Sequence, residues 1–141
     1  MLSGTTALGV SAYLVLSFPQ DAAASASTMT PNEALEAAAK GEILFVDIRR
    51  PDEWARTGIP RHATNIDLRV PTFVDQVLEA RISDTQPVAV ICARGVRSAR
   101  ITRLLTEAGV GPLSDIPEGM LGSGAGPGWL KRGLPVQSYE R

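Results

Sequence analysis

Two short stretches of the chain are almost purely apolar. They cover residues 43–47 and 87–91 and are rich in valine and isoleucine. Such a run without polar alternation is typical of a strand buried on both faces of a parallel sheet. Residues 63–68 and 113–116 are weaker strand candidates, because each follows a proline-containing turn and mixes apolar with polar residues. The pattern therefore predicts four strands.

Helix signals lie between these strands. Thr30 and Glu33 have the spacing of a capping box, with Pro31 in the first turn. They predict a helix over residues 33–40, which Gly41 ends. Further helices are expected over residues 51–57, 71–82 and 98–108. Strands that alternate with helices predict a three-layer α/β domain, with a mainly parallel sheet flanked by helices.

Two of the predicted helices have an apolar side that should pack on the sheet. In the segment 71–82 this side comprises Phe73, Val74, Val77, Leu78 and Ile82. In the segment 98–108 the inward residues are Ile101, Leu104, Leu105 and Ala108, and the outward residues are Arg100, Arg103 and Glu107. Residues 119–128 contain five glycines in ten positions and predict a loop.

Composition and charge argue against several classes of protein, including nucleic-acid-binding and metal-binding proteins. The chain has 141 residues, of which 44% are hydrophobic, and a net charge of −1. A nearly balanced charge argues against a nucleic-acid partner. One cysteine excludes an intramolecular disulfide and a cysteine-rich zinc site. Because there is also only one histidine, we expect no metal site and no cofactor.

The first 26 residues differ from the rest. Residues 7–18 are apolar, no charge precedes Asp21, and Ala24-Ser25-Ala26 has the form of a signal-peptidase site. We expect residues 1–26 to be a signal peptide or an N-terminal anchor, and residues 27–141 to be one domain. The protein would then be periplasmic or exported, with no other membrane contact. Residues 1–6 hold no positive charge, which a misassigned start site or an uncleaved anchor would explain. The alternative is a disordered tail or an extra helix of the domain, and the protein would then be cytoplasmic.

The single cysteine, Cys92, stands where the run 87–91 ends and a helix is about to begin. Backbone N–H groups converge at such a point and stabilise an anion. Gly95 permits the positive φ that a tight turn needs, and Arg94 and Arg97 add positive charge. These features favour a reactive thiolate over a buried, inert thiol, which is the alternative.

The sequence therefore predicts Cys92 as the nucleophile. The residues expected to bind an anionic substrate are Ala93, Arg94, Gly95, Val96 and Arg97. Such a loop could stabilise a persulfide, or it could hold a phosphate or arsenate oxyanion.

The segment from Cys92 to Ser98 resembles the C-x-x-G-x-R-S active-site pattern of single-domain rhodaneses, which are sulfurtransferases of the thiosulfate:cyanide type. Three further segments are similar to family motifs and occur in the same order: Asp47-Ile48-Arg49 with Glu53-Trp54; Gly58-Ile59-Pro60 with Ala63 and Asn65-Ile66; and Gly119-Met120 with Trp129 and Gly133-Leu134-Pro135-Val136.

The resemblance implies a rhodanese-like fold and a ping-pong mechanism. Cys92 would take the outer sulfur of thiosulfate or a similar donor as a persulfide and pass it to cyanide or a thiol. Arg97 would hold the donor, whereas a substrate role for Arg94 is inferred from its charge alone. The loop has six residues from Cys92 to Arg97, against seven in the related dual-specificity phosphatases, so sulfur is favoured over phosphate.

Other matched residues are expected to be structural. Asp47, Arg49 and Glu53 would pair to fix the loops, and Trp54 and Trp129 would pack in the core. His62 does not occupy the position of the family's histidine, so we expect an exposed loop residue.

Two other functions stay open. The protein could be a persulfide carrier that serves a partner sulfur-transfer protein, or an anion-binding regulatory domain whose cysteine does not react. Since the chain has no second thiol, a small sulfur-containing anion and an external acceptor are the expected partners in sulfur transfer.

Overall fold

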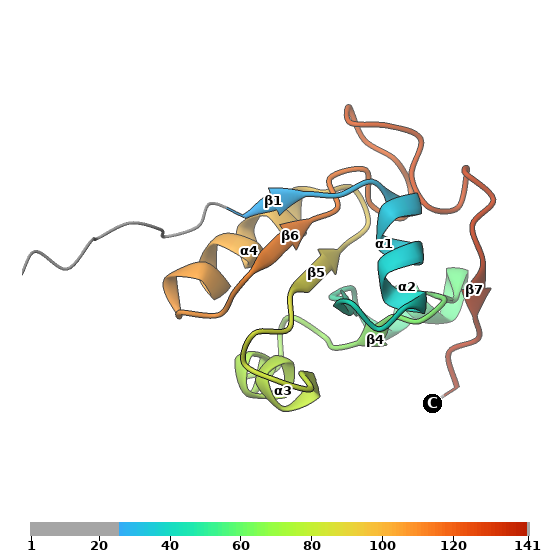
Figure 1. The fold of residues 1–141 in the computed structure, drawn as a ribbon. Helices are drawn as coiled ribbons and strands as arrows, with labels where there is room; N and C mark the ends of the chain where they lie inside the picture. The colour runs from blue at the N-terminus through green and yellow to red at the C-terminus, as the bar shows by residue number, and fades with distance from the viewer. Residues whose placement is uncertain (1–25, 141) are drawn as a thin grey trace, which may run out of the picture.

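A five-stranded parallel sheet runs through the domain in the order β1-β6-β5-β2-β4 (Figure 1). The computed structural model describes residues 26–140. The strands of the sheet are β1 (Ser27–Thr28), β2 (Leu44–Asp47), β4 (Thr64–Asn65), β5 (Val88–Ile91) and β6 (Leu113–Asp115). The four predicted strands are all present, although β4 keeps only two of its six expected residues. The predicted signal or anchor lies, apart from Ala26, outside the described residues and stays a prediction.

The two apolar runs form the centre of the sheet. Every residue of β2 and β5 is buried, and the two strands pair so that Asp47 lies opposite Ile91. Alternate residues face opposite sides: Val46 and Val90 belong to one apolar cluster, and Phe45 and Ile91 to the other. The carboxyl ends of both strands therefore meet at one edge.

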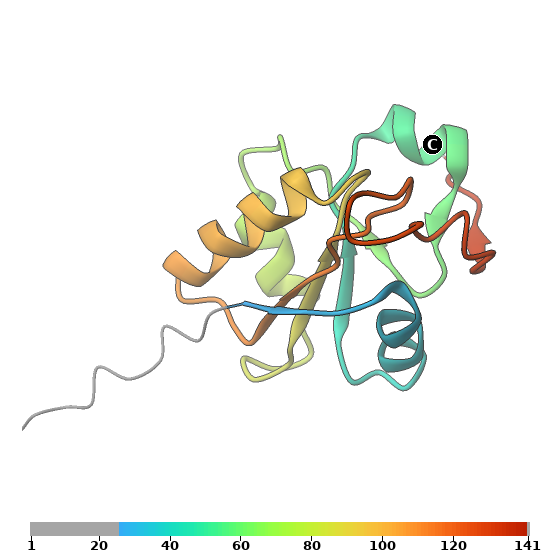
Figure 2. The same ribbon diagram turned by 90° about the horizontal axis from the view of Figure 1, so that it is seen from above.

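Within residues 26–140, four helices complete the three layers. They are α1 (Pro31–Ala39), α2 (Pro51–Thr57), α3 (Phe73–Ala80) and α4 (Val96–Glu107). The helices α3 and α4 cover one face of the sheet, and α1 and α2 lie on the other (Figure 2). The capping box of α1 is present, with the Glu33 carboxylate accepting from the Thr30 N–H at 2.7 Å. No helix within residues 26–140 is long and apolar enough to cross a membrane.

The apolar sides of α3 and α4 are narrower than predicted. In α3 only Phe73 and Val77 are buried, because this short helix packs a single row of side chains on the sheet. Val74 and Leu78 flank that row and are exposed, and Ile82 lies beyond the end of the helix with 82% of its surface exposed. The predicted inward positions of these three residues are wrong.

The helix α4 begins at Val96, two residues earlier than predicted. Its buried row is Ser98, Ile101, Thr102 and Leu105. This register leaves Leu104 46% exposed, and Ala108 is exposed at the C-terminal cap, so the inward assignment of both residues is wrong. Arg100, Arg103 and Glu107 are exposed, as predicted.

Two small strands complete the fold. β3 (Ile59–Pro60) and β7 (Val136–Gln137) form a separate antiparallel pair. Trp129 is fully buried against Phe45, with ring centroids 5.5 Å apart, and Trp54 is buried beside Tyr139. The prediction that both tryptophans pack in the core is confirmed.

Candidate active site

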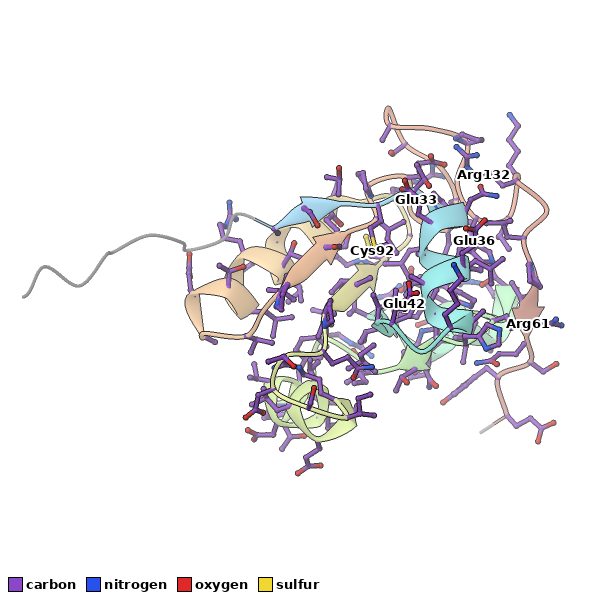
Figure 3. All side chains as sticks on the ribbon, viewed as in Figure 1. Glu33, Glu36, Glu42, Arg61, Cys92 and Arg132 are labelled. Atoms are coloured by element: carbon purple, nitrogen blue, oxygen red, sulfur yellow. The ribbon has the colours of Figure 1, made fainter. Side chains whose placement is uncertain are left out.

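Cys92 follows β5 directly and lies within the fold, at the edge where the strands end (Figure 3). Its exposed fraction is 1%. The Gly95 N–H donates to the Cys92 Sγ at 3.1 Å, and the thiol donates to the Ser98 Oγ at 3.5 Å. Gly95 is the N-cap of α4, so a hydrogen bond and the helix N-terminus both favour negative charge on this sulfur.

The path of the cysteine loop, residues 92–97, depends on two glycines for steric reasons. Gly95 has φ +84°, and a Cβ at this residue would collide with the Pro117 carbonyl. A Cβ at Gly119 would collide with the Ala93 carbonyl in the same way. The Met120 N–H donates to the Cys92 carbonyl at 2.9 Å. The chain after β6 therefore packs closely on the cysteine loop and fixes its path.

Arg97 forms a two-point ion pair with Glu53, which comes from α2. Its Nη1 lies 2.8 Å from Oε2 and its Nη2 lies 2.6 Å from Oε1. Glu53 also accepts the Arg50 N–H at 3.0 Å. The hydrogen bonds from Arg97 lower the pKa of Glu53 to about 2. Both terminal nitrogens of Arg97 are thus engaged by a carboxylate, and a role for Arg97 in holding the donor stays a prediction.

Asp47 and Arg49 form a second pair at the end of β2, where Asp47 lies opposite Ile91. The Arg49 Nη2 donates to the Asp47 Oδ2 at 2.8 Å, and both side chains are buried. Arg49 also donates to the Thr57 Oγ1 and the Gly58 carbonyl. This network ties the end of β2 to the end of α2, the element that carries Glu53.

The remaining loop residues differ in exposure. Arg94 is exposed. Within residues 26–140 its side chain makes one hydrogen bond, from Nη1 to the Gly122 carbonyl at 3.4 Å. Val96 is 79% exposed, and Ala93 is half-buried. Of the backbone N–H groups expected to line the loop, that of Gly95 donates to the sulfur.

Two buried polar residues near the loop were not predicted. Ser98 is fully buried and receives the thiol hydrogen bond. Asp115 ends β6; its Oδ1 has no hydrogen-bond partner within residues 26–140, and burial raises the pKa of its carboxyl while the Ser98 hydroxyl lowers it. The sequence did hold a signal for Ser98, which is the last residue of the C-x-x-G-x-R-S pattern. Asp115 carried no signal, since only the packing of α4 on β6 brings it near Ser98.

A third unpredicted group closes the glycine-rich loop. Glu118 is buried and pairs with Arg132 through bonds of 2.7 Å to each carboxylate oxygen. It also accepts the Gly128 N–H at 3.0 Å. Because Glu118 sits between Pro117 and Gly119, this pair holds the segment that packs on the cysteine loop. His62 is exposed, as predicted.

Comparison with known proteins identifies relatives by sequence and by fold. The sequence model of the Rhodanese-like domain matches residues 30–122, about two thirds of the chain. Among curated proteins, none matches the chain.

Several solved structures share the fold. The polysulfide-sulfur transferase homodimer from Wolinella succinogenes has a TM-score of 0.63 and 22% identity over 84% of this chain and 82% of its own. The Rv0390 protein from M. tuberculosis has a TM-score of 0.63 and 27% identity, over 81% of this chain and 98% of its own. A protein of unknown function from Rhodopseudomonas palustris, labelled a possible tyrosine phosphatase, has a TM-score of 0.60 and 25% identity, over 80% and 86%.

The fold confirms the α/β architecture, and the cysteine loop lies inside the matched region. From the match over residues 30–122 it follows that the chain belongs to the Rhodanese-like domain family.

Proposed function

We propose that the protein is a sulfurtransferase that takes a sulfane sulfur from thiosulfate or a similar donor as a persulfide on Cys92. It then passes this sulfur to a thiophilic acceptor such as cyanide or a thiol. The hydrogen bond from the Gly95 N–H to the Cys92 Sγ, at the N-terminus of α4, is the observation that carries the proposal. The name of the Wolinella succinogenes neighbour adds that the fold occurs in a polysulfide-sulfur transferase.

The reaction needs no oxidant or reductant. The Cys92 thiolate attacks the outer sulfur of thiosulfate, a new sulfur–sulfur bond forms, and sulfite leaves with the electron pair of the broken bond. The terminal sulfur of the persulfide then bonds to the acceptor, and Cys92 leaves as the thiolate. With cyanide the product is thiocyanate. The Gly95 N–H would stabilise the negative charge on Sγ before the first step and after the second.

Two features favour sulfur over phosphate. The loop from Cys92 to Arg97 has six residues, and Pro117 packs against it at Gly95. The label on the Rhodopseudomonas palustris neighbour makes phosphatase activity a direct control.

The test is a two-step mass measurement on the purified protein. Thiosulfate should add the mass of one sulfur atom, and cyanide should remove it and release thiocyanate. The Cys92→Ser variant should gain nothing, and p-nitrophenyl phosphate should not be hydrolysed. If sulfur is accepted only from another persulfidated protein, the carrier function replaces the enzyme; if no donor adds sulfur, both are wrong.

An exported location is part of the proposal and has its own test. N-terminal sequencing of the native protein should start at Ser27 if residues 1–26 are a cleaved signal. A retained Met1 would instead favour an anchor or a cytoplasmic protein.

A further inference from the structure

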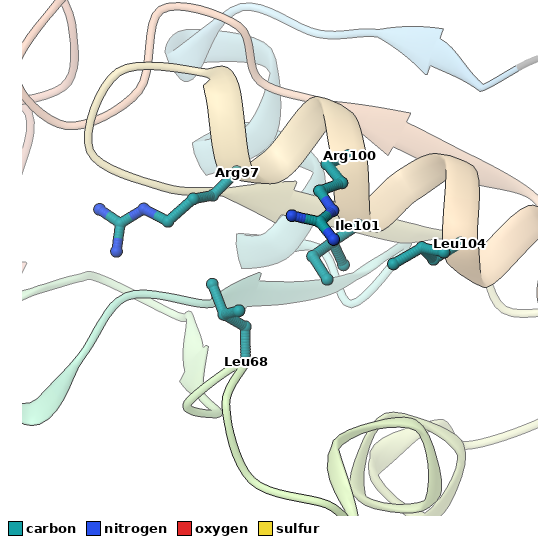
Figure 4. Close-up of a pocket in the computed structure, with 5 residues that line it drawn as sticks. All are labelled: Leu68, Arg97, Arg100, Ile101 and Leu104. Carbon is teal, nitrogen blue, oxygen red and sulfur yellow. The ribbon is translucent and has the colours of Figure 1, made fainter.

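A groove runs along α4 beside the cysteine loop. It is lined by Leu68, Arg97, Arg100, Ile101 and Leu104 and has a volume of about 270 Å³ (Figure 4). Four of these residues come from α4, and Leu68 comes from the segment that follows β4. We call it the α4 groove. Arg97 lies in the first turn of α4, so this end of the groove is the end nearest the cysteine loop.

The lining combines apolar surface with positive charge. Ile101 forms a buried floor, and Leu104 is 46% exposed. Arg100 is exposed and has no carboxylate partner within residues 26–140, whereas Arg97 is held by Glu53. A half-exposed leucine next to an arginine without an ion pair fits a ligand that has both an aliphatic and an acidic side chain.

The positive charge extends beyond the groove, along α4 and into the loop before it. Arg94, Arg97, Arg100 and Arg103 follow one another at every third position, and in the described part of the chain only Arg97 makes an ion pair. Two acidic residues lie near these arginines. Asp67, next to Leu68, pairs with Arg69 at 2.6 Å, and Glu107, the last residue of α4, follows Arg103 by four residues and offsets one of the four positive charges. This face is therefore positive, although the whole chain carries a net charge of −1.

The size of the groove indicates the class of ligand. Sites for small organic molecules usually have volumes of about 300–1,000 Å³ and enclose most of the ligand. The α4 groove is smaller, and a further apolar side chain, that of Val96, is 79% exposed at the start of α4. A groove that takes one or two side chains, with more apolar surface beside it, fits a docked protein segment better than a small molecule.

We propose that the α4 groove docks an acidic, aliphatic segment of a partner protein that receives sulfur from Cys92. An aliphatic side chain of the segment packs on Ile101 and Leu104, and its carboxylate pairs with Arg100. This assignment rests on the proposed sulfurtransferase function. It adds that the acceptor thiol belongs to a protein whose acidic segment is recognised next to the cysteine loop.

The probe is a synthetic peptide that alternates glutamate and leucine and ends in one cysteine. Its matched control replaces each glutamate by lysine. The protein is first loaded with sulfur from thiosulfate, and the rate of sulfur transfer to each peptide is followed by mass spectrometry. Transfer to cyanide is measured in parallel, since cyanide needs no docking.

We expect the acidic peptide to accept sulfur about ten times faster than the basic peptide at low salt, with the difference shrinking as salt is raised. Arg100→Glu should remove this preference and leave transfer to cyanide within about twofold of the wild type. Arg103→Glu makes the same charge change on α4 outside the groove lining and should retain most of the preference.

Three outcomes are distinguishable. Equal rates for the two peptides would overturn the docking proposal, and so would equal losses in Arg100→Glu and Arg103→Glu, because the effect would then be general charge attraction. If the wild type takes up no sulfur or fails to transfer it to cyanide, the proposed function itself fails. Circular dichroism of both variants checks that they fold.

Discussion

The ion pair between Glu53 and Arg97 should be a main support of the cysteine loop. We propose to test it with Glu53→Gln. Glutamine has nearly the same shape and can still accept the Arg50 N–H that Glu53 accepts at 3.0 Å. It loses the negative charge that faces the two nitrogens of Arg97 at 2.8 and 2.6 Å. The substitution therefore removes the charge of the pair and keeps the packing.

The expected loss follows from the pKa of Glu53. Its carboxyl has a pKa of about 2, against a usual value of 4.5, mainly because of the hydrogen bonds from Arg97. At about 1.4 kcal/mol for each pKa unit, this difference corresponds to about 3 kcal/mol. Since the Arg97 side chain is 33% exposed, solvent screens part of the interaction. We expect Glu53→Gln to lower the free energy of unfolding by about 1–3 kcal/mol at pH 7.

The pH dependence gives the sign of the effect. Because the pKa of Glu53 is lower in the folded protein, the stabilisation is complete above pH 4.5 and is lost as the pH falls toward about 2. The stability difference between wild type and Glu53→Gln should therefore shrink over that range. Urea denaturation followed by circular dichroism measures it at each pH.

Asp52→Asn is the matched control. Asp52 precedes Glu53 in α2 and pairs with Arg56 at 3.2 Å, but both side chains are more than half exposed. Its neutralisation should cost less than about 0.5 kcal/mol. Equal losses in the two variants, or a loss in Glu53→Gln that stays constant down to pH 2, would refute the assignment of Glu53 as a support of the loop.

Two further predictions concern the surroundings of Cys92. Gly95→Ala should destabilise the protein by at least about 2 kcal/mol and abolish persulfide formation, because φ is +84° and the new Cβ meets the Pro117 carbonyl. The control Gly124→Ala should be nearly neutral, since nothing lies within 4 Å of a Cβ at that position. Equal melting temperatures of the two variants would contradict this prediction. Asp115→Asn should raise the free energy of unfolding by about 1 kcal/mol at pH 7 in urea denaturation, since burial raises the pKa of this carboxyl and its Oδ1 has no partner within residues 26–140. The free energy of unfolding of the wild type should fall relative to that of Asp115→Asn as the pH rises above 3.8, and a difference that does not change with pH would count against this role of Asp115.

The sequence alone predicted the parts of the fold that depend on local pattern. The runs that became β2 and β5 are apolar at almost every position, and the capping box of α1 is a contact over three residues. β1 could not be predicted, because Ser27–Thr28 is polar and exposed and is held by main-chain pairing with β6. The exposed positions of Leu78 and Leu104 depend on how wide a row each helix packs, which the residue spacing does not define.

The candidate site divides in the same way. The positive φ of Gly95 and the position of Cys92 at the strand end followed from residue types and their order. The partner of Arg97 did not, since Glu53 is 44 residues earlier in the chain and reaches it only because the first turns of α2 and α4 meet at the edge where the strands end. The earlier start of α4 also places Arg97 in the first turn of the helix, where it meets Glu53.

The most direct test of the account is the intact mass of the protein after incubation with thiosulfate. We expect a gain of one sulfur atom that depends on Cys92 and that cyanide removes as thiocyanate. An unchanged mass with thiosulfate, polysulfide and a persulfidated protein donor would contradict the assignment of Cys92 as a sulfur-carrying nucleophile.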